Sequence, residues 1–363
     1  MTPSFCSILP PYLVAKTKPK QLIKDAELRA RRNTFLQFRN IIHGQEHEEI
    51  RRLFDSKNTY DFPEQPIKTE VQKHSTEESN DPVLQMANII YDHFHNSLNR
   101  ESWDNKNGSV DLFINFGQKY NNAFWDGEHL VFGNGDGQYF NSFLILDVVA
   151  HEYGHAITDT TARLIYQGQS GALNEHFSDV VGISIKHLFD DATNNTAKNW
   201  LIGEGLFNSR FNARGLRDME NPGTAYNHPE LGKDPQPDHM DRYYNGSDDN
   251  GGVHINSGIP NKAFSTFCKS TGLKSYDLPL AVWYNALLES GENTGFLEFA
   301  DITVKTLKDF YKSESDTIQK LVLAWATVGI EVTEVEPPPD TEPPATKHCC
   351  KILDRIKKML KEE

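Results

Sequence analysis

The sequence predicts an α+β protein in which a strand-containing front part precedes a helical back part. Before about residue 137, VDLFINF has the apolar character of a strand, and the glycine-rich FGNGDGQYF follows it. From Phe143 to about Val332, apolar residues recur at helical spacing, in amphipathic runs separated by loops rich in Gly, Asn and Asp. The acidic, proline-rich EVEPPPDTEPPATKH then indicates an extended linker at the end of the folded part.

Composition excludes some classes of partner. The 363 residues are 37% hydrophobic and 24% charged, which is typical of a soluble globular protein with more than one core. The formal charge of −14 argues against nucleic acid or an anionic membrane as the partner of the main body. We expect no signal peptide, no membrane span and reduced cysteines, because the long apolar segments and regular cysteine spacing that would indicate them are missing from the sequence.

The first 52 residues, here called the N-terminal arm, differ in charge from the rest. They carry ten Lys or Arg against five Asp or Glu, a charge of +5, which leaves −19 for the remainder of the chain. The segment from Lys20 to Arg52 is predicted to be helical. A basic arm before an acidic body either docks on that body or is a solvated extension.

The segment HEYGH has the spacing of a metal site. On a helix, His151 and His155 lie one turn apart and can face the same point. Glu152 is rotated by about 100° from His151, so it can reach a water at that point as a general base without being a ligand. A catalytic zinc needs three protein ligands and one open position, so a third ligand must come from elsewhere in the chain.

Glu175 is the candidate for the third ligand. It lies twenty residues after His155, and Asp179 follows it at helical spacing. Asp179 is placed to accept the free ring N–H of one ligand histidine, and Asn174 to serve the other. GQSGA is expected to form a tight turn, so that the second helix folds back against the first.

These residues, together with NNAFWDG, GALNEHFSD and DNGGVHINSGIPNKAF, make the chain resemble the thermolysin-like zinc metallopeptidases over roughly residues 60 to 332. The resemblance implies a two-lobe fold, with a β-rich N-terminal lobe, a helical C-terminal lobe and the active-site cleft between them. It implies a zinc-dependent neutral endopeptidase that hydrolyses peptide bonds in proteins and binds one catalytic Zn²⁺. The alternatives are a peptide-binding module with a dormant site and an aminopeptidase of the same zinc class, although the GxMEN-like segment of such enzymes is missing from the sequence.

The resemblance also implies a role for individual residues. The zinc ligands would be His151, His155 and Glu175, and Glu152 would be the general base. The charge on the tetrahedral intermediate would be stabilised by Tyr166 and His254, with Asp249 orienting the histidine. Asn122 and Ala123 would bind the substrate backbone as an added strand, and Arg217 would reach a substrate carbonyl.

The matching side-chain pocket is apolar, which implies cleavage before Leu, Ile, Phe or Val. The alternative is that the pocket residues belong to an ordinary core, and an apparent deletion between Gly137 and Asp147 leaves two of the assignments, Phe140 and Phe143, open. The five positions are Phe140, Phe143, Val148, Ile202 and Leu216.

Calcium binding is where the sequence departs from many secreted members, which bind a pair of calcium ions through several carboxylates. Two matching carboxylates, Asp147 and Glu204, are present, but Lys186 stands where a shared carboxylate would be, and Asn199 and Leu201 replace two more. An ammonium group repels calcium. We expect the double-calcium site to be lost at Lys186, which would pair with Asp147 and Glu204, and calcium content stays open.

The front of the chain resembles the short propeptide of the protealysin-like subgroup, with its motif at Pro10, Pro11, Tyr12 and Leu13. Proline fixes an extended backbone, so this segment is expected to lie in the cleft as a poorly cleaved pseudo-substrate and intramolecular inhibitor. Autolysis is expected between about Ile41 and Asp61. The family is mostly extracellular, but no signal peptide is expected here, so the expected location is cytoplasmic or, by a leaderless route, outside the cell.

The tail lies outside the resemblance. KILDRIKKMLK predicts a basic amphipathic helix after Cys349 and Cys350, which could be an acylated membrane anchor, a disulfide-linked dimer contact, a docking helix or an inert appendage. The expected domains are therefore an arm (1–52), a β-rich lobe (53–150), a helical lobe (151–332), a proline-rich linker (333–348) and a basic tail (349–363).

Overall fold

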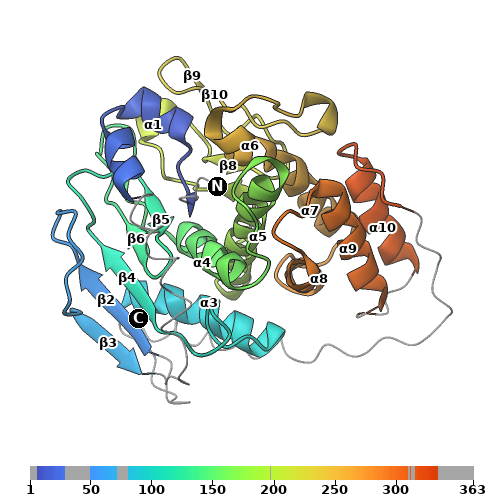
Figure 1. Cartoon of the computed structure of the whole chain (residues 1–363), viewed down its shortest axis with the longest axis horizontal. Helices are drawn as coiled ribbons and strands as arrows, with labels where there is room; N and C mark the ends of the chain where they lie inside the picture. Colours follow the sequence, from blue (N-terminus) through green and yellow to red (C-terminus); the bar gives the residue numbers. More distant parts are fainter. Residues whose placement is uncertain are drawn as a thin grey trace.

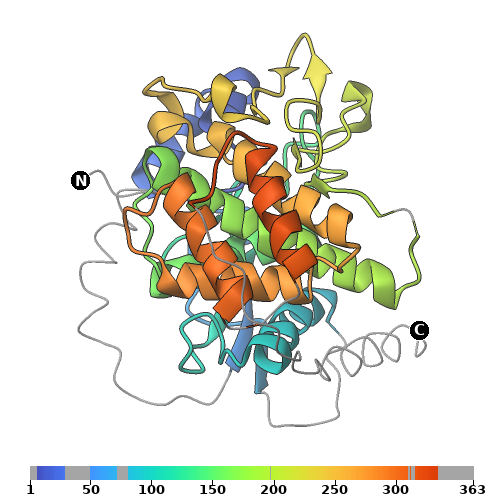
Figure 2. The same cartoon turned by 90° about the vertical axis from the view of Figure 1, so that its right-hand side faces the viewer.

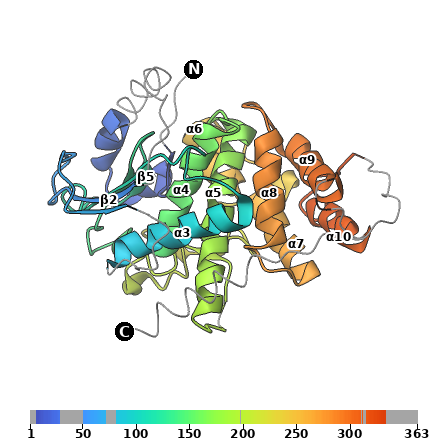
Figure 3. The ribbon, with the colours of Figure 1, turned by 90° about the horizontal axis from the view of Figure 1, so that it is seen from below.

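The computed structural model describes residues 6–28, 50–71, 81–196, 198–309, 311 and 315–333. Two central helices, α4 (Leu146–Thr160) and α5 (Gly168–Ala192), lie between a sheet on one side and a group of helices on the other (Figure 1). The view from below shows the same order of parts (Figure 3). The expected α+β class, with a sheet-rich N-terminal region and a helical C-terminal region, is confirmed.

The main sheet has six strands in the order β1-β5-β6-β4-β2-β3. The expected strand in VDLFINF is confirmed as β4, which pairs in parallel with both of its neighbours. The edge strand β1 comes from the N-terminal arm and pairs antiparallel with β5, with Cys6 opposite Trp125 and Ser7 opposite Phe124. The strands are β1 (Cys6–Ser7), β2 (Ile50–Asp55), β3 (Lys68–Val71), β4 (Val110–Ile114), β5 (Ala123–Trp125) and β6 (Leu130–Phe132).

Strand β2 corrects the prediction of a helix from Lys20 to Arg52. Residues 21–28 are helical, residues 29–49 lie outside the described part, and the last three residues of the segment begin β2. Arg51 is buried with its guanidinium 4.8 Å from the ring centroid of Tyr91, and Arg52 forms two hydrogen bonds to Asp111, of 2.7 and 2.6 Å. These tertiary partners stabilise an extended backbone that the charged sequence does not indicate. The expected boundary between residues 52 and 53 therefore falls inside β2.

The close contact of α4 with α5 depends on small residues. A side-chain carbon on Gly154 would lie 2.7 Å from Cα of Ser178, and one on Gly182 would lie 2.7 Å from the carbonyl oxygen of Asp147. Glycine at both places lets the two backbones approach, which brings HEYGH opposite Glu175. The expected turn at GQSGA is wrong in position, because Gly168 already begins α5 and the connection occupies residues 161–167.

The remaining helices surround this pair. Helix α3 packs against β2 and α4, while α7 to α10 form the outer layer on the opposite side (Figures 1 and 2). The helical pattern expected from Phe143 is interrupted at residues 193–247 by loops and the short strands β7 to β10. Besides residues 21–28, the described helices around the central pair are α1 (Pro11–Thr17), α3 (Pro82–Leu98), α6 (Asp248–Asn256), α7 (Gly258–Thr271), α8 (Leu278–Glu289), α9 (Phe296–Asp309) and α10 (Ser315–Ala326); the short strands are β7 (Leu201–Ile202), β8 (Arg217–Asp218), β9 (Asn227–His228) and β10 (Gly232–Lys233).

Among the helices of the described residues, none is both long enough and apolar enough to cross a bilayer. Most of the buried apolar residues form one cluster, which includes Ile8, Leu9, Leu13 and Val14 of the N-terminal arm as well as residues of α4, α5 and α7 to α10. These four apolar residues of the arm are therefore packed into the protein core.

Acid stability is expected to depend on His93, which is fully buried in α3. Burial lowers the pKa of His93 to about 4, because the charged ring loses its hydration. The neutral ring is accommodated above pH 6.5, and as the pH falls from 6.5 towards 4 the unfolded chain binds a proton that the folded chain does not. The free energy of unfolding therefore falls by up to roughly 3 kcal/mol over this range. Urea unfolding at several pH values measures this loss.

The replacement His93→Gln removes this titration, and it is expected to flatten the loss of stability between pH 6.5 and 4.5. His95→Gln, at a partly exposed position two residues further along α3, is the matched control for the loss of a histidine. An unaltered acid slope in His93→Gln would show that other groups cause the acid sensitivity.

Candidate active site

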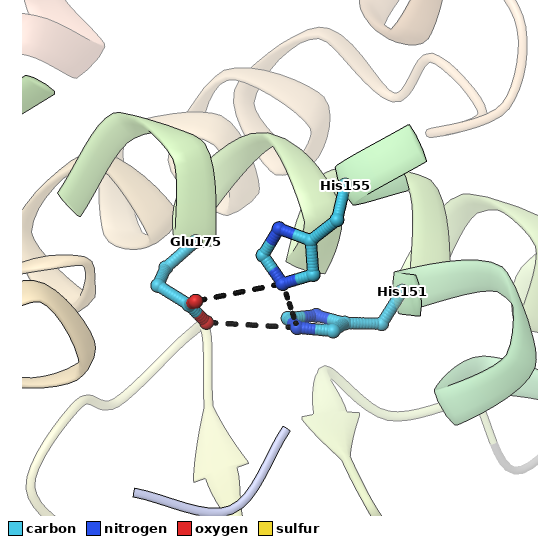
Figure 4. A group of neighbouring side chains, drawn as sticks. All are labelled: His151, His155 and Glu175. Carbon is cyan, nitrogen blue, oxygen red and sulfur yellow. Dashed lines mark hydrogen bonds and ion pairs between the residues drawn. The ribbon is translucent and has the colours of Figure 1, made fainter. Parts of the chain in front are cut away.

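Three buried side chains meet where α4 faces α5 (Figure 4). The Nε2 atoms of His151 and His155 lie 3.0 Å apart, and each is 3.5 Å from a different carboxylate oxygen of Glu175. All three side chains are 0% exposed, and their nearest ligand atoms lie within 4.8 Å of one another. The spacing of HEYGH on one helix and Glu175 on the next therefore produces a compact cluster of two nitrogens and a carboxylate.

The hydrogen bonds around this cluster fit a bound cation. His151 Nδ1 lies 2.9 Å from Asp179 Oδ1, and His155 Nδ1 lies 2.8 Å from Asn174 Oδ1. Because each Nδ1 donates to an oxygen, each Nε2 of a neutral ring carries a lone pair, and the two lone pairs face each other. Glu175 Oε2 accepts no hydrogen bond from the described residues. Two lone pairs and a carboxylate oxygen in this arrangement are the donors that zinc takes.

Asp179 connects the cluster to Arg217. Its two oxygens accept hydrogen bonds from Arg217 Nε and Nη2, at 2.8 and 2.7 Å, as well as from His151. Burial alone would raise the pKa of Asp179, but Arg217 and His151 outweigh it and hold the pKa well below its usual range. Asn261 Nδ2 donates a further bond of 2.9 Å to Asp179. Asn261 lies in the segment DNGGVHINSGIPNKAF, but nothing in its position in the sequence indicates this contact.

Glu152 lies beside the cluster and contacts backbone rather than the other carboxylates. Oε2 accepts from the N–H of Trp125, at 2.9 Å, and Oε1 from the N–H of Ile8, at 3.1 Å. Burial and the neighbouring Glu175 raise the pKa of Glu152 well above its ordinary value. A carboxyl group with a raised pKa and a peptide N–H at hydrogen-bond distance is suited to moving a proton.

Tyr166 and His254 approach the cluster from the other side. The Tyr166 hydroxyl donates a hydrogen bond to Glu175 Oε1 and lies 3.3 Å from His254 Nε2. His254 Nδ1 lies 2.6 Å from Asp249 Oδ1. Burial alone would lower the pKa of His254, but Asp249 and Glu175 outweigh it and raise the pKa to about 9, so the ring carries a proton on both nitrogens at neutral pH.

An unusual backbone segment positions Asp249. Residues 249–252, DNGG, have positive φ values between 51° and 78° at the start of α6. Asn, Asp and Gly are the residues that adopt this left-handed conformation most readily. The turn brings Asp249 back towards His254, whose backbone N–H also donates to Asp249 Oδ2, at 2.9 Å.

The N-terminal arm crosses the site as an added strand. His254 Nε2 donates to the carbonyl oxygen of Ser7, at 2.8 Å, and Arg217 Nη1 donates to that of Ile8, at 3.1 Å. The N–H of Leu9 donates to Asn122 Oδ1, at 2.9 Å. Backbone hydrogen bonds on both sides of Ile8 thus hold an extended peptide over the cluster.

The proline motif lies after this strand rather than over the cluster. Pro10 has an extended backbone, with φ −63° and ψ 146°, and Pro11 begins α1, so the motif is extended only at its first residue. Leu13 is fully buried, and Tyr12 packs against the same apolar cluster. The expectation that Pro10 to Leu13 itself forms the extended segment across the site is corrected, because Ser7, Ile8 and Leu9 occupy that place.

The five expected pocket residues are all buried and belong to the same apolar cluster as Ile8, which is itself 0% exposed. These residues are Phe140, Phe143, Val148, Ile202 and Leu216, and none is more than 2% exposed. Burial fits either a pocket that the arm fills or an ordinary core, so their role stays a prediction.

Lys186 makes part of the expected contacts. Its Nζ lies 2.8 Å from Glu204 Oε2, 3.0 Å from Asn199 Oδ1 and 3.1 Å from the carbonyl oxygen of Leu201. Asp147 instead accepts from the N–H of Gly203, at 2.8 Å. Burial raises the pKa of Asp147, and Lys186 opposes this rise only from a longer range. The expected pair with Glu204 is present, and the one with Asp147 is replaced by a backbone contact.

Some predictions lie outside the described residues. These are the segment 29–49, which contains the first part of the expected autolysis region, and everything from residue 334 on, including the linker beyond Thr333, Cys349, Cys350 and the basic tail. Of the two described cysteines, Cys6 and Cys268, both are buried and neither forms a disulfide.

A buried pair of histidines with a glutamate, a second glutamate at a peptide N–H and a strand of peptide laid across them define a metallopeptidase site. Similarity to known proteins identifies the family of metallopeptidases to which the chain belongs. The family profile described as the catalytic domain of thermolysin metallopeptidase matches residues 40–159, and that of the α-helical domain matches residues 162–330. The chain belongs to the thermolysin metallopeptidase family and is a zinc-dependent neutral endopeptidase of that family.

Individual relatives are similar over most of the chain. An extracellular metalloprotease of Pectobacterium carotovorum subsp. carotovorum is 36% identical over 344 residues, which are 91% of this chain and 97% of that protein. The protease PrtS of Photorhabdus sp. (strain Az29) is 37% identical, over 78% of this chain and 77% of its own. The structure of the precursor of protealysin from Serratia proteamaculans has a TM-score of 0.75 and 35% identity, over 90% of this chain and 99% of that one.

Proposed function

We propose that this endopeptidase cuts proteins on the amino side of bulky apolar residues and is made as a precursor whose N-terminal arm blocks its own site. The observation that carries the proposal is the path of Ser7 to Leu9 across the residues of the site, with hydrogen bonds to His254, Arg217 and Asn122. A protein substrate would have to displace this segment, because both would use the same donors and acceptors. The similarity to a protealysin precursor supports the same interpretation.

The proposed roles follow from what each group contacts. Zinc held by His151, His155 and Glu175 would polarise a substrate carbonyl and lower the pKa of water towards about 7. Glu152 takes a proton from the attacking water and delivers it to the nitrogen of the broken bond, where the N–H of Ile8 now lies at 3.1 Å. His254 donates to the carbonyl oxygen on which negative charge develops, with Tyr166 beside it.

The course of the arm favours an endopeptidase over an aminopeptidase. The backbone continues in both directions from Ile8, with Cys6 and Ser7 paired to β5 on one side and Leu9 bound to Asn122 on the other. An aminopeptidase must recognise a free amine close to the bond that it cuts. Here the corresponding nitrogen, on Ser7, is preceded by Cys6, which is itself paired with β5, and this supports binding in the middle of a chain.

Side-chain preference is proposed from the residue at the central position. Ile8 is fully buried in the apolar cluster that contains all five expected pocket residues. A charged side chain there would lose its hydration without a partner, which costs several kcal/mol. Substrates with Leu, Ile, Phe or Val in place of Ile8 are therefore expected to be preferred.

The test compares two fluorogenic peptides that differ at one residue, Gly-Leu against Gly-Asp. The processed enzyme with zinc is expected to show a kcat/KM at least about tenfold higher for Gly-Leu, and a chelator should abolish both activities until zinc is restored. Zinc binding without hydrolysis of either peptide would favour the binding module with a dormant site. If the enzyme removes N-terminal residues from peptides with a free N-terminus and cuts no blocked peptide, this result would favour the aminopeptidase.

We further propose that the enzyme acts outside the cell, as the name of the Pectobacterium relative says of that protein. The alternative, cytoplasmic action, is distinguished by finding the processed chain in the medium or in the cell fraction, beside a cytoplasmic marker.

Calcium is expected to have little effect on stability. The ammonium group of Lys186 lies among Glu204, Asn199 and Leu201, where it provides the positive charge that a metal would otherwise supply. Millimolar calcium is expected to change Tm by less than about 2 °C relative to the same concentration of magnesium, in thermal unfolding of the full chain. A large rise in Tm with calcium alone would contradict the loss of the calcium site.

A further inference from the structure

One peptide bond of the N-terminal arm, Ser7–Ile8, has both of its polar atoms aligned with the groups of the site. Its carbonyl oxygen, on Ser7, accepts from His254 Nε2, at 2.8 Å. Its nitrogen, on Ile8, lies 3.1 Å from Glu152 Oε1 and also donates to the carbonyl oxygen of Ala123, at 3.2 Å. The proton donor and the base of the proposed mechanism thus face the two ends of the same amide.

The contacts on both sides fix this register. Cys6 and Ser7 are paired with Trp125 and Phe124 of β5, so the strand cannot shift without losing its ladder. Beyond the bond, Arg217 holds the carbonyl oxygen of Ile8, at 3.1 Å, and Asn122 Oδ1 accepts from the N–H of Leu9, at 2.9 Å. A shift by one residue would also take the Ile8 side chain out of the apolar cluster.

We propose that Ser7–Ile8 is a bond which the enzyme hydrolyses in its own arm, so that the inhibitor is a substrate held in the productive register. This rests on the proposed peptidase function. The oxygen of a water molecule forms a bond to the Ser7 carbonyl carbon, and the bond from that carbon to the Ile8 nitrogen breaks. Glu152 takes a proton from the water and passes it to the nitrogen, and the second water proton follows to the same nitrogen, which leaves a carboxylate on Ser7 and a protonated amino group on Ile8.

This cut does not by itself free the site. The contacts that anchor the arm lie after the cut: Leu13 and Val14 are buried, and Gln21 exchanges two hydrogen bonds with the backbone of Asn121, of 2.9 and 3.0 Å. Asp25 accepts from the hydroxyl of Tyr120, at 2.7 Å. The product therefore keeps Ile8 and Leu9 in place, with the new amino group next to Glu152, and full activity requires removal of the rest of the arm in a second step.

The test follows the full chain with zinc over time by intact mass and by sequencing of new N-termini. The wild type is expected to lose residues 1–7 and gain an N-terminus at Ile8 before the remainder of the arm disappears and before Gly-Leu peptide is hydrolysed at full rate. A first-order rate that is the same at two protein concentrations tenfold apart shows that each chain cuts itself. Glu152→Gln should keep residues 1–7.

Variants at the aligned bond sharpen the test. Ile8→Leu keeps an apolar side chain and is expected to be cut at the same bond, whereas Ile8→Asp should be cut there at least about tenfold more slowly. Processing of the wild type that yields peptidase activity with no N-terminus at Ile8 overturns this proposal and leaves the peptidase function standing. A cut at Ile8 in Glu152→Gln, or an equal rate in Ile8→Asp, also overturns it, and a wild type that binds zinc yet cuts neither itself nor the peptide overturns both.

Discussion

Glu152→Gln is expected to lower kcat for a Gly-Leu peptide by roughly 10²- to 10⁴-fold, the size of a general-base contribution. An amide of almost the same shape cannot take a proton from water at neutral pH. Residue 152 does not belong to the buried group of metal ligands, His151, His155 and Glu175, so the zinc content of the purified variant should stay at the level of the wild type. Burial and Glu175 raise the pKa of Glu152, which makes the native carboxylate a stronger base than an exposed one.

The control for this result is Glu298→Gln, the same chemical change at an exposed position in the first turn of α9. Steady-state kinetics and metal analysis on all three proteins, after the arm of each has been removed by the same added protease, separate chemistry from arm release. Activity within tenfold of wild type in zinc-loaded Glu152→Gln would require a different base. Loss of zinc in that variant would mean that Glu152 also supports the metal.

The sequence was sufficient to predict the zinc cluster because its information is local. HEYGH lies on one helix and Glu175, with Asp179 one turn later, on another, so the offsets alone place the side chains on common faces. What brings the two faces together is less visible, since it depends on Gly154 and Gly182 at the contact of the helices. The misplaced turn at GQSGA has the same origin, because glycines serve close packing as well as turns.

The sequence was insufficient where partners lie far along the chain. The charged run that ends at Arg52 has helical character, but burial of Arg51 against Tyr91 and the pairing of Arg52 with Asp111 decide for a strand. Neither partner can be identified from spacing.

The register of the N-terminal arm was likewise hidden. Pro10 and Pro11 are the distinctive residues in this part of the sequence. The segment that crosses the site, Ser7 to Leu9, has no distinctive residue types and binds mainly through its backbone. Backbone recognition leaves little trace in a sequence. Trp125 was missed for the same reason, since it contributes its backbone N–H to Glu152.

Leu13→Ala is expected to release the site in the uncut chain. Leu13 is fully buried in the main apolar cluster, and loss of such a side chain costs about 2–5 kcal/mol. For a covalently attached arm that docks reversibly, this cost falls largely on the docked state. The population with an open site should therefore rise by roughly 30-fold or more, at 1.4 kcal/mol for each factor of ten.

The measurement is the initial rate of Gly-Leu peptide hydrolysis by full-length protein, taken while intact mass shows that the arm is uncut. Ile23→Ala provides a matched control, because this residue lies on the same arm with 68% of its surface exposed and should leave the rate unchanged. If uncut Leu13→Ala is as inactive as the wild type, docking of the arm is not what limits activity. Inhibition would then have to lie in the arrangement of the catalytic groups themselves, and release would have to follow cleavage rather than precede it.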